Sequence, residues 1–401
     1  MKALVIAPQP FFSPRGTPFS IYFRTLITAE LGIEIDLLTY GEGNDIDIPG
    51  VRIIRIPRFA FLGDVEVGPS ILKLFLDIFL SAWSVGLLLC RRYDFIHAHE
   101  EAVFFCRFLK LIFRFKLIYD MHSSLPQQLT NFRFTNSRFL TGIFYKLEKN
   151  CLRAADAIIT ICPDLSQYVN GLIHEEKKLF LVENSIFDPI KLVRRLSDCD
   201  TNSSYQEFQG NLLKLPTGKR FIVYAGTLEP YQGIDILIAA FSKVVTKNPD
   251  AFLIIVGGTK QQVEKFSALA ENYGLGPHCL LIGRVPPSLA KDYCKFASVL
   301  VSPRSKGINT PLKVYEQLAS GIPLVATKIY SHTQVLNDKV AFLVKPEPED
   351  MARGILKALN SDGEVQKITR NAKRLYEQKY SRPVYKKKLQ QLFDYLSQCA
   401  E

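Results

Sequence analysis

The chain has 401 residues, which is too long for one ordinary hydrophobic core and suits two domains. Hydrophobic residues make up 47% and charged residues 22%, as in globular proteins, so wholesale disorder, collagen and a coiled coil are excluded. The net charge of +11 favours a polyanionic partner: nucleotide phosphates, nucleic acid or an anionic membrane. Residues 186–401 carry net +10 and residues 1–185 only net +1, so the excess lies in the second half.

Short apolar runs separated by helical patterns fill the first half, and they predict strands buried on both faces of a parallel sheet. The predicted strands are 2–7, 34–40, 51–56, 94–97, 116–119, 157–161 and 179–182. Longer helical segments lie between them, at 20–31, 70–89 and 139–154. This alternation predicts a doubly wound α/β domain, resembling a Rossmann fold, over residues 1–186.

Three observations concern compartment and membrane. Eight cysteines without a C-x-x-C pair are too few for a disulfide framework and indicate reduced thiols in a cytoplasmic protein. The first apolar run is too short for a signal peptide. The longest apolar stretch, 71–90, is interrupted by Lys73 and Asp77, which predicts a buried or interfacial helix rather than one that spans a bilayer.

The same rhythm restarts after residue 219 and predicts a second Rossmann-like domain over 219–379. Its predicted strands are 220–225, 251–256, 279–282, 298–302, 323–326 and 341–344. Residues 187–218 are rich in Ser, Asp, Asn and Gly, without a period, and are interpreted as a linker. Ligands of such sheets bind at the carboxyl ends of the strands, so the residues that follow each strand are the candidate site residues.

The first strand leads into a Pro- and Gly-containing loop with Arg15, Gly16 and Thr17, followed by a helix. Backbone N–H groups of such a loop and a helix N-terminus form a cradle for phosphate or carboxylate, to which Arg15 adds a charge. A plain turn from strand to helix is the alternative. The chain has neither a G-x-G-x-x-G fingerprint nor a Walker loop, which disfavours NAD-dependent and P-loop enzymes.

Histidines follow two strands of the first half: His97 and His99 after one, and His122, with Asp120, after the next. Alternation along an extended strand places His97 and His99 on one face. The favoured interpretation is an active-site cluster of His99, Asp120 and His122. A metal site, with a third ligand from Asp120 or His122, and ordinary core histidines are the alternatives.

The densest signal of the second half runs from Ser302 to Thr327: strand, cationic loop, helix, strand. Thr310 followed by proline predicts an N-cap and a helix from about Thr310 to Gly321. That helix N-terminus, with Arg304, Lys306 and Lys313 nearby, suits a diphosphate. Glu316 could accept hydrogen bonds from ribose hydroxyls; a salt bridge or a solvated helix face is the alternative.

These segments, in this order, resemble the GT-B fold glycosyltransferases of family 4 over essentially the whole chain. The resemblance rests on Gly16, His99, His122, the turn 183–185, Gly226 to Gly233, Gly257, the turn 283–285, the run 318–327, and a final helix over about 380–401. It implies two Rossmann-like domains facing across a cleft, with the final helix packing back on the first domain.

The resemblance also implies an activity. It is a retaining transfer of a sugar from a nucleotide-diphospho-sugar, bound mainly by the second domain, to a glycan or lipid-linked acceptor in cell-surface polysaccharide or glycolipid synthesis. No metal and no further cofactor are expected, because cationic side chains and helix dipoles neutralise the leaving diphosphate. His122 matches the family histidine near the donor sugar, Glu316 the glutamate on the ribose, and Asn309 and Thr310 the backbone amides at the phosphates.

The chain departs from the family pattern at three places. Ile308 stands where the first of two glutamates is usual, Thr227 and Gln232 stand where an Arg and a Lys are usual, and the first loop has one clear glycine. Arg15, Arg304, Lys306 and Lys313 are the cations that could replace the missing pair. Another GT-B enzyme, such as a nucleotide-sugar epimerase, and a non-catalytic partner subunit therefore stay open.

Residues 102–153 combine nine basic side chains, against Asp120 and Glu148, with many phenylalanines. Such a stretch suits an anionic membrane surface, which a lipid-linked acceptor would explain, and the protein is expected to be cytoplasmic or peripheral on the inner face of the membrane. Ordinary core phenylalanines with solvated cations are the alternative. Nucleic acid is the least favoured partner and is not expected.

Overall fold

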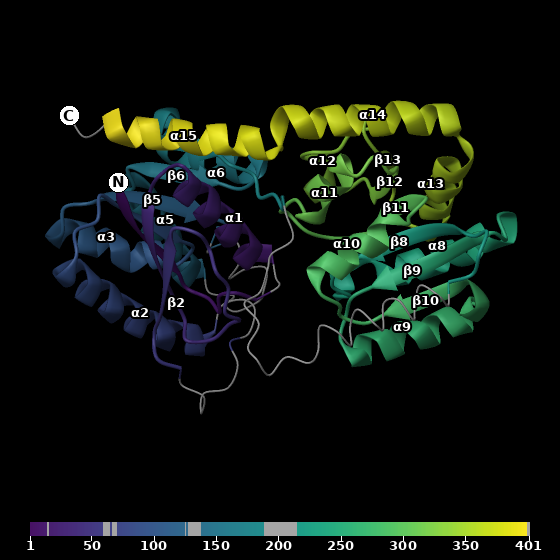
Figure 1. The fold of residues 1–401 in the computed structure, drawn as a ribbon, viewed down its shortest axis with the longest axis horizontal. Coiled ribbons are helices and arrows are strands. Elements are labelled where there is room, and N and C mark those ends of the chain that lie inside the picture. The colour runs from purple at the N-terminus through teal and green to yellow at the C-terminus, as the bar shows by residue number, and fades with distance from the viewer. Residues whose placement is uncertain are drawn as a thin grey trace. The chain divides into compact units, whose positions relative to one another are not determined.

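A computed structural model describes residues 1–13, 16–58, 65, 70–124, 126, 138–187 and 215–398, with the backbone alone for 138–141. The described residues form two compact units (Figure 1). Unit 1 holds Met1–Ser185 together with the C-terminal helix from Arg382, and unit 2 holds the described chain from Leu215 to Ser381. The predicted linker 187–218 lies mostly outside the described residues.

Unit 1 is a parallel sheet covered by helices, and its strand order is β3-β2-β1-β4-β5-β6-β7. Its strands are β1 (Lys2–Ala7), β2 (Glu34–Thr39), β3 (Val51–Arg55), β4 (Phe95–His99), β5 (Lys116–Met121), β6 (Ala157–Thr160) and β7 (Leu179–Leu181). Its helices are α1 (Gly16–Glu30), α2 (Ile71–Cys90), α3 (Ala102–Ile112), α5 (Arg138–Ala154), α6 (Pro163–Ile173) and α15 (Arg382–Gln398), with a short 3₁₀ turn η2 (Glu176–Lys178).

The two faces of the unit 1 sheet bury alternate residues against different helices, as a pleated strand requires. Leu4 and Ile6 of β1 lie in one core with Leu80 of α2 and Cys106 of α3. On the other face α1 packs beside α15 (Figure 1), and the rings of Phe95 and Phe393 lie 5.4 Å apart. The last helix of the chain thus completes the core of unit 1.

Unit 2 repeats the architecture with a six-stranded parallel sheet of order β10-β9-β8-β11-β12-β13. Its strands are β8 (Arg220–Ala225), β9 (Ala251–Val256), β10 (Cys279–Ile282), β11 (Val299–Ser302), β12 (Leu324–Thr327) and β13 (Phe342–Val344). Its helices are α8 (Ile234–Lys247), α9 (Lys260–Asn272), α10 (Pro287–Lys295), α11 (Lys313–Ala319), α12 (Tyr330–Thr333), α13 (Pro348–Asn360) and α14 (Asp362–Lys379), with 3₁₀ turns η3 (Pro230–Gln232) and η4 (Gly276–His278).

Both sheets reverse their strand order at one place, between β1 and β4 in unit 1 and between β8 and β11 in unit 2. Loops that follow strands on the two sides of such a switch point diverge and leave room for a ligand at the carboxyl edge. The predicted strands are confirmed to within two residues at every end. The α/β class and the two Rossmann-like sheets are therefore confirmed.

Two predicted helix starts were wrong. Helix α1 begins at Gly16 rather than at residue 20. The sequence predicts a helix that starts near Thr310, but α11 begins at Lys313, and Pro311 and Leu312 form a turn before it. The Thr310 hydroxyl is buried without a hydrogen-bond partner among the described residues, so it does not cap the helix. The physical reason is that Val314 N–H donates to the Pro311 carbonyl and Tyr315 N–H to the Leu312 carbonyl, a tight turn that replaces the first helical turn.

Candidate functional site

The polar cluster of unit 1 lies at the carboxyl ends of β4 and β5, beside the switch point. Asp120 is fully buried, and its Oδ2 accepts hydrogen bonds from Arg24 Nη1 at 2.5 Å and from His97 at 2.9 Å. His99 Nδ1 lies 3.2 Å from His122 Nε2, and the rings of His97 and His99 stack at 4.5 Å. The structure therefore brings the three predicted residues His99, Asp120 and His122 together.

Burial and charge decide the protonation of this cluster. Burial would raise the pKa of Asp120, but the Arg24 guanidinium and the neighbouring imidazoles outweigh it and hold that pKa well below its usual range. Burial lowers the pKa of His122 to about 4 and holds that of His99 well below its usual value, although the Asp120 charge opposes both shifts. At neutral pH the site therefore presents a carboxylate and two neutral imidazoles, which can accept or donate a hydrogen bond without carrying charge.

Arg24 is the residue of this cluster that the sequence analysis missed. It is fully buried in α1 and donates to Asp120, to the Val182 carbonyl, to Asn184 Oδ1 and, through Nε at 3.0 Å, to the hydroxyl of Tyr385 on α15. A lone arginine among the apolar residues of a predicted helix was the available signal, since such a charge is buried only when it is paired.

A metal ion is the alternative for this cluster, because ligand atoms of His97, His99 and Asp120 all lie within 4.8 Å of one another. The chemistry of the set argues against it. The oxygen that a cation would take already accepts from Arg24, so the ion would lie beside a permanent positive charge. His99 Nε2 is buried without a hydrogen-bond partner among the described residues, which leaves it for a polar ligand. Asp120 Oδ1 lies 3.4 Å from His122 Nε2.

The cationic centre of unit 2 lies at its own switch point, between the ends of β8 and β11. The Lys313 ammonium nitrogen is buried and makes no hydrogen bond to any residue that the structure describes. It lies 3.9 Å from the centre of the Tyr224 ring, and a Cβ on Gly226 would lie 3.4 Å from it. Burial, with the nearby Arg304 charge, lowers the pKa of Lys313 to about 7.

Arg304 shapes the loop around this amine. Its Nε donates to the Lys306 carbonyl at 2.7 Å and its Nη1 to the Asn309 carbonyl at 3.1 Å, while the guanidinium lies over the Tyr231 ring. Arg304 is therefore occupied largely by its own loop. The Lys306 side chain is exposed, so of the three predicted cations of this loop only Lys313 presents a buried charge without a partner.

The two neutral residues that replace the usual family cations contact each other. Gln232 Nε2 donates to Thr227 Oγ1 at 3.3 Å, and Tyr224 donates to the Thr227 carbonyl at 2.6 Å. Gln232 Oε1 is buried without a partner in the described part of the chain. The loop is thus held by neutral hydrogen bonds, and positive charge reaches it from Lys313.

Gly257 can carry no side chain. Its φ is +119°, and a Cβ there would lie 2.0 Å from the Gly226 carbonyl oxygen. This close approach of two backbones joins the Gly226 loop to a hollow of about 570 Å³ that opens beyond it. The hollow is lined by Gly258, Thr259, Lys260, Val263, Glu264, Gly283 and Arg284.

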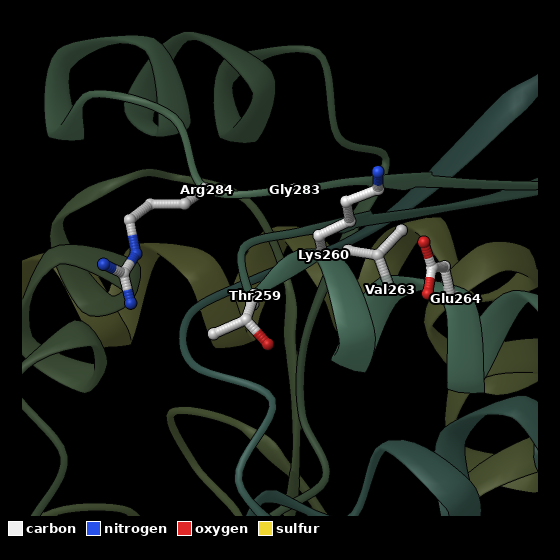
Figure 2. A pocket seen from close by; sticks show the side chains of 7 residues that line it. Thr259, Lys260, Val263, Glu264, Gly283 and Arg284 are labelled. Atoms are coloured by element: carbon white, nitrogen blue, oxygen red, sulfur yellow. The ribbon is translucent and has the colours of Figure 1, made fainter.

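Figure 2 shows Arg284 on one side of this hollow and Glu264 on the other, with Thr259 and Lys260 from the start of α9 between them. Thr259 and Gln262 form a capping box that fixes the first turn of α9. The volume is within the range of small-molecule sites.

The remaining predicted residues take separate places. Glu316 lies in the first turn of α11, and burial raises the pKa of its carboxyl, with Lys291 opposing the shift. Gly16 and Thr17 are the first residues of α1 in unit 1, and Arg15 lies outside the described residues. The sequence analysis missed His332, which is buried, lies 3.0 Å from Ser302 Oγ and 2.8 Å from the Thr327 carbonyl, and ties β11 to β12.

The comparisons with known proteins complete this description. The chain matches the family described as Glycosyltransferase Family 4 over residues 27–186 and the one described as Glycosyl transferases group 1 over residues 206–375. Together the two matches cover most of the chain. The chain belongs to the glycosyltransferases of the family 4 type.

Individual relatives and solved structures are similar to the chain in the same way. An uncharacterized glycosyltransferase of Methanocaldococcus jannaschii is 23% identical over 87% of this chain and 86% of its own. A phosphatidyl-myo-inositol mannosyltransferase of Mycobacterium tuberculosis is 27% identical over 41% of this chain and 43% of its own. The crystal structure of Anabaena HepE in complex with UDP superposes with a TM-score of 0.71 at 15% identity, covering 98% of this chain and 100% of that one. The fold is thus GT-B, as the resemblance implied, and the family assignment favours an enzyme over the non-catalytic subunit.

Proposed function

We propose that this glycosyltransferase takes its sugar from a nucleotide-diphospho-sugar and that Lys313 is the main charge on the diphosphate. The observation that carries the proposal is the buried, unpartnered ammonium of Lys313 at the switch point of unit 2. A buried ammonium without a counter-ion is costly, which is why its pKa falls to about 7. A diphosphate against Gly226 would supply the missing anion and hold the amine protonated.

Further groups of unit 2 suit the rest of the donor. The Thr310 hydroxyl and Gln232 Oε1, both buried without partners among the described residues, offer hydrogen bonds near the same loop. We assign the hollow beside Gly258 to the nucleoside end, because it adjoins the Gly226 loop and has room for a base and ribose. Glu316 is assigned to the ribose hydroxyls. HepE, whose structure contains UDP, has the same fold.

The reaction is proposed to be retaining and metal-independent, with no further cofactor. Lys313 would stabilise the charge that develops on the departing diphosphate, the task that a divalent cation performs in other enzymes. His122, neutral and oriented through His99 and Asp120, would hydrogen-bond the transferred sugar. The Arg24 guanidinium on Asp120 leaves that carboxylate poorly placed to ligate a metal.

The acceptor is proposed to be a glycan or a lipid-linked sugar, in cell-surface polysaccharide or glycolipid synthesis. The Mycobacterium tuberculosis relative is named for transfer to a phosphatidylinositol, which is a lipid acceptor. We place the protein in the cytoplasm, at the anionic inner face of the membrane. Its six described cysteines are all free thiols, which suits a reducing compartment. No nucleic-acid partner is proposed.

The test is a thermal-shift screen against UDP, GDP and ADP and their sugars, with and without magnesium and EDTA. A true donor at about 100 times its Kd adds about 2.7 kcal/mol to stability, and the shift should survive EDTA. Donor hydrolysis without acceptor, measured for the nucleotides that shift the protein, then tests turnover. Silence from every nucleotide would reject the donor, and a shift abolished by EDTA would reject metal independence.

A further inference from the structure

Helix α2 exposes apolar residues where a helix in contact with water usually exposes polar ones. Among its 20 residues only Lys73 and Asp77 are charged, and both are half-buried. The exposed positions of the helix are without exception apolar residues or glycine: Ile71, Leu74, Phe75, Ile78, Ala82, Trp83, Gly86, Leu89 and Cys90. A surface helix of a soluble domain shows the opposite pattern, with charged residues outward.

The charged side chains of α2 are directed toward the rest of unit 1. Asp77 Oδ1 accepts a hydrogen bond from the Tyr40 hydroxyl at 2.6 Å. Lys73 lies near Glu100, where burial raises the pKa of the carboxyl to about 8 and the Lys73 charge opposes that rise. These polar contacts fix the rotation of α2 about its own axis, and its apolar side therefore faces away from the sheet.

Helix α3 extends the same surface. It packs against α2 (Figure 1), and its exposed residues Phe108, Leu111 and Ile112 share one side through their i, i+3 and i+4 spacing. Ile78 and Leu111 are 67% and 82% exposed. Scattered exposed apolar residues are normal, but exposed apolar residues concentrated on two helices that pack together mark an interaction surface.

Positive charge borders this patch at one end. Both helices lead directly into strands, so their last residues lie at the amino edge of the sheet. Arg92, Arg114 and Lys116 lie there beside the single acidic residue of these two connections, Asp94, while Arg91 pairs with Asp36. The other end of α2, near Lys73, lies beside Glu100, which directly follows His99. The patch thus runs from a basic edge to the edge that carries the histidine cluster.

We propose that α2 and α3 dock unit 1 on an anionic lipid bilayer, with the apolar patch immersed among the headgroups and upper acyl chains. The basic edge is what favours lipid over a protein partner, since it complements phosphates of anionic headgroups. By length and composition α2 could span a membrane, but Leu76, Leu80, Ser84 and Leu88 form a buried stripe that packs into unit 1. The helix therefore lies in the plane of the interface, as amphipathic anchors do.

This inference rests on the proposed function only for its purpose: a lipid-linked acceptor would lie at the edge of unit 1 that carries the histidine cluster. Its evidence is independent, since it comes from the exposed side of α2 and α3. Membrane binding and nucleotide binding are therefore measured on the same samples, so that loss of membrane docking can be distinguished from loss of nucleotide binding.

The chain offers its own probe, because Trp83, on α2 and 40% exposed, is its single tryptophan. On adding vesicles that contain phosphatidylglycerol, the emission of Trp83 should move to shorter wavelength, and brominated acyl chains should quench it. Vesicles of phosphatidylcholine alone should give a weaker effect, because only the anionic surface attracts the basic edge. The difference between the two kinds of vesicle should grow as the salt concentration falls.

Variants decide whether the patch carries the binding. Ile78→Glu and Leu111→Glu should each lower vesicle affinity about tenfold or more, because a carboxylate would have to enter the interface. Arg92→Glu and Arg114→Glu should weaken binding to anionic vesicles and leave binding to neutral ones unchanged. Phe296→Glu is the matched control, an exposed aromatic residue of unit 2, and should bind like the parent. All five should keep the parent far-UV spectrum and nucleotide-induced thermal shift.

Three results would overturn the proposal. In the first, vesicles leave the Trp83 emission unchanged. In the second, the Ile78→Glu protein floats with vesicles like the parent. In the third, neither protein binds vesicles, the parent is a dimer, and Ile78→Glu dissociates it. The last result would assign the patch to a second copy of the chain.

Discussion

The Arg24 guanidinium lies 2.5 Å from Asp120 Oδ2, and both side chains are fully buried in unit 1. Arg24 also bonds the hydroxyl of Tyr385 on α15. One arginine thereby connects the histidine cluster, the first helix and the last helix of the chain, and sets the charge of Asp120.

Arg24→Met should destabilise unit 1 by about 3–5 kcal/mol, because it leaves a buried carboxylate without its partner. Urea unfolding at neutral pH measures this loss. Arg52→Met is the matched control: Arg52 pairs with Asp36 from the surface, and Asp36 keeps Tyr93 and Arg91 as partners, so about 0–1 kcal/mol is expected. Equal losses in the two variants would show that burial of the Arg24 pair is not what matters.

The same pair predicts a pH dependence. The folded-state pKa of Asp120 lies well below that of the unfolded chain, so its contribution to stability is present above about pH 4 and is lost as the pH falls through the folded-state value. In Arg24→Met the pKa should rise with the loss of the guanidinium. The stability difference between parent and variant should therefore shrink on acidification, and a constant difference would contradict the assignment.

Lys313→Met should weaken binding of the effective nucleotide diphosphate by a factor of about 10 or more, since a charge-assisted contact contributes about 1.5–3 kcal/mol. Lys306→Met removes an exposed charge from the same loop and should change affinity about fivefold at most. Isothermal titration calorimetry compares them. An equal loss in both variants would mean that loop charge in general, rather than the buried amine, holds the anion.

Affinity should also fall with rising pH in the parent. Lys313 has a pKa of about 7 without ligand, and only its protonated form attracts an anion. Above pH 7 binding must therefore take up a proton, and the Kd should increase between pH 7 and 9, whereas Lys313→Met should lack that increase. Proton uptake is measurable as a buffer-dependent binding enthalpy, and a pH-independent Kd would contradict the role of the amine.

Glu316→Ala should weaken nucleotide binding by a factor of about 10 without abolishing the fold, if its carboxylate accepts the ribose hydroxyls. The parent should bind a 2′-deoxy nucleotide less tightly than the ribonucleotide. The variant should bind the two equally. Glu377→Ala, at an exposed position of α14, is the control and should bind like the parent. A normal preference for ribose in Glu316→Ala would remove Glu316 from that contact.

His122→Ala should spare nucleotide binding, because His122 belongs to unit 1, and should lower turnover by a factor of about 10²–10⁴. Donor hydrolysis and thermal shift on one preparation separate the two effects. His174→Asn, at the exposed C-cap of α6, should keep both. Unchanged turnover in His122→Ala would exclude His122 from the site.

Most strands were predictable from the sequence because they are short contiguous apolar runs, as a parallel sheet buried on both faces requires; β2 and β3 carry Asp36 and Arg52 within such runs. The residues that follow the strands were predictable for the same reason, since the fold places them at one edge. Lys313 could be named as a cation of the loop, but not as the buried one. Its burial depends on Tyr224 and Gly226, which are about ninety residues distant and meet it only through the pairing of β8 with β11.

Other parts could not be predicted from local pattern. The basic, phenylalanine-rich stretch 102–153 contains residues of both kinds: Phe104, Phe105 and Phe113 pack against the core, whereas Phe108 is exposed. Two more of its phenylalanines, Phe132 and Phe134, lie outside the described residues. The exposed face of α2 was hidden because hydropathy does not say which side of an apolar helix its two charges occupy.

The position of α15 has a consequence for how the protein is made. Tyr385, Leu389, Leu392, Phe393 and Leu396 are buried within unit 1, although unit 2 separates them from the rest of it in sequence. A ribosome therefore completes unit 2 while unit 1 still lacks one helix and the hydroxyl that holds Arg24. The unit synthesised first is the last that can finish folding, and a nascent chain stopped before residue 382 should expose an unfinished apolar surface to chaperones.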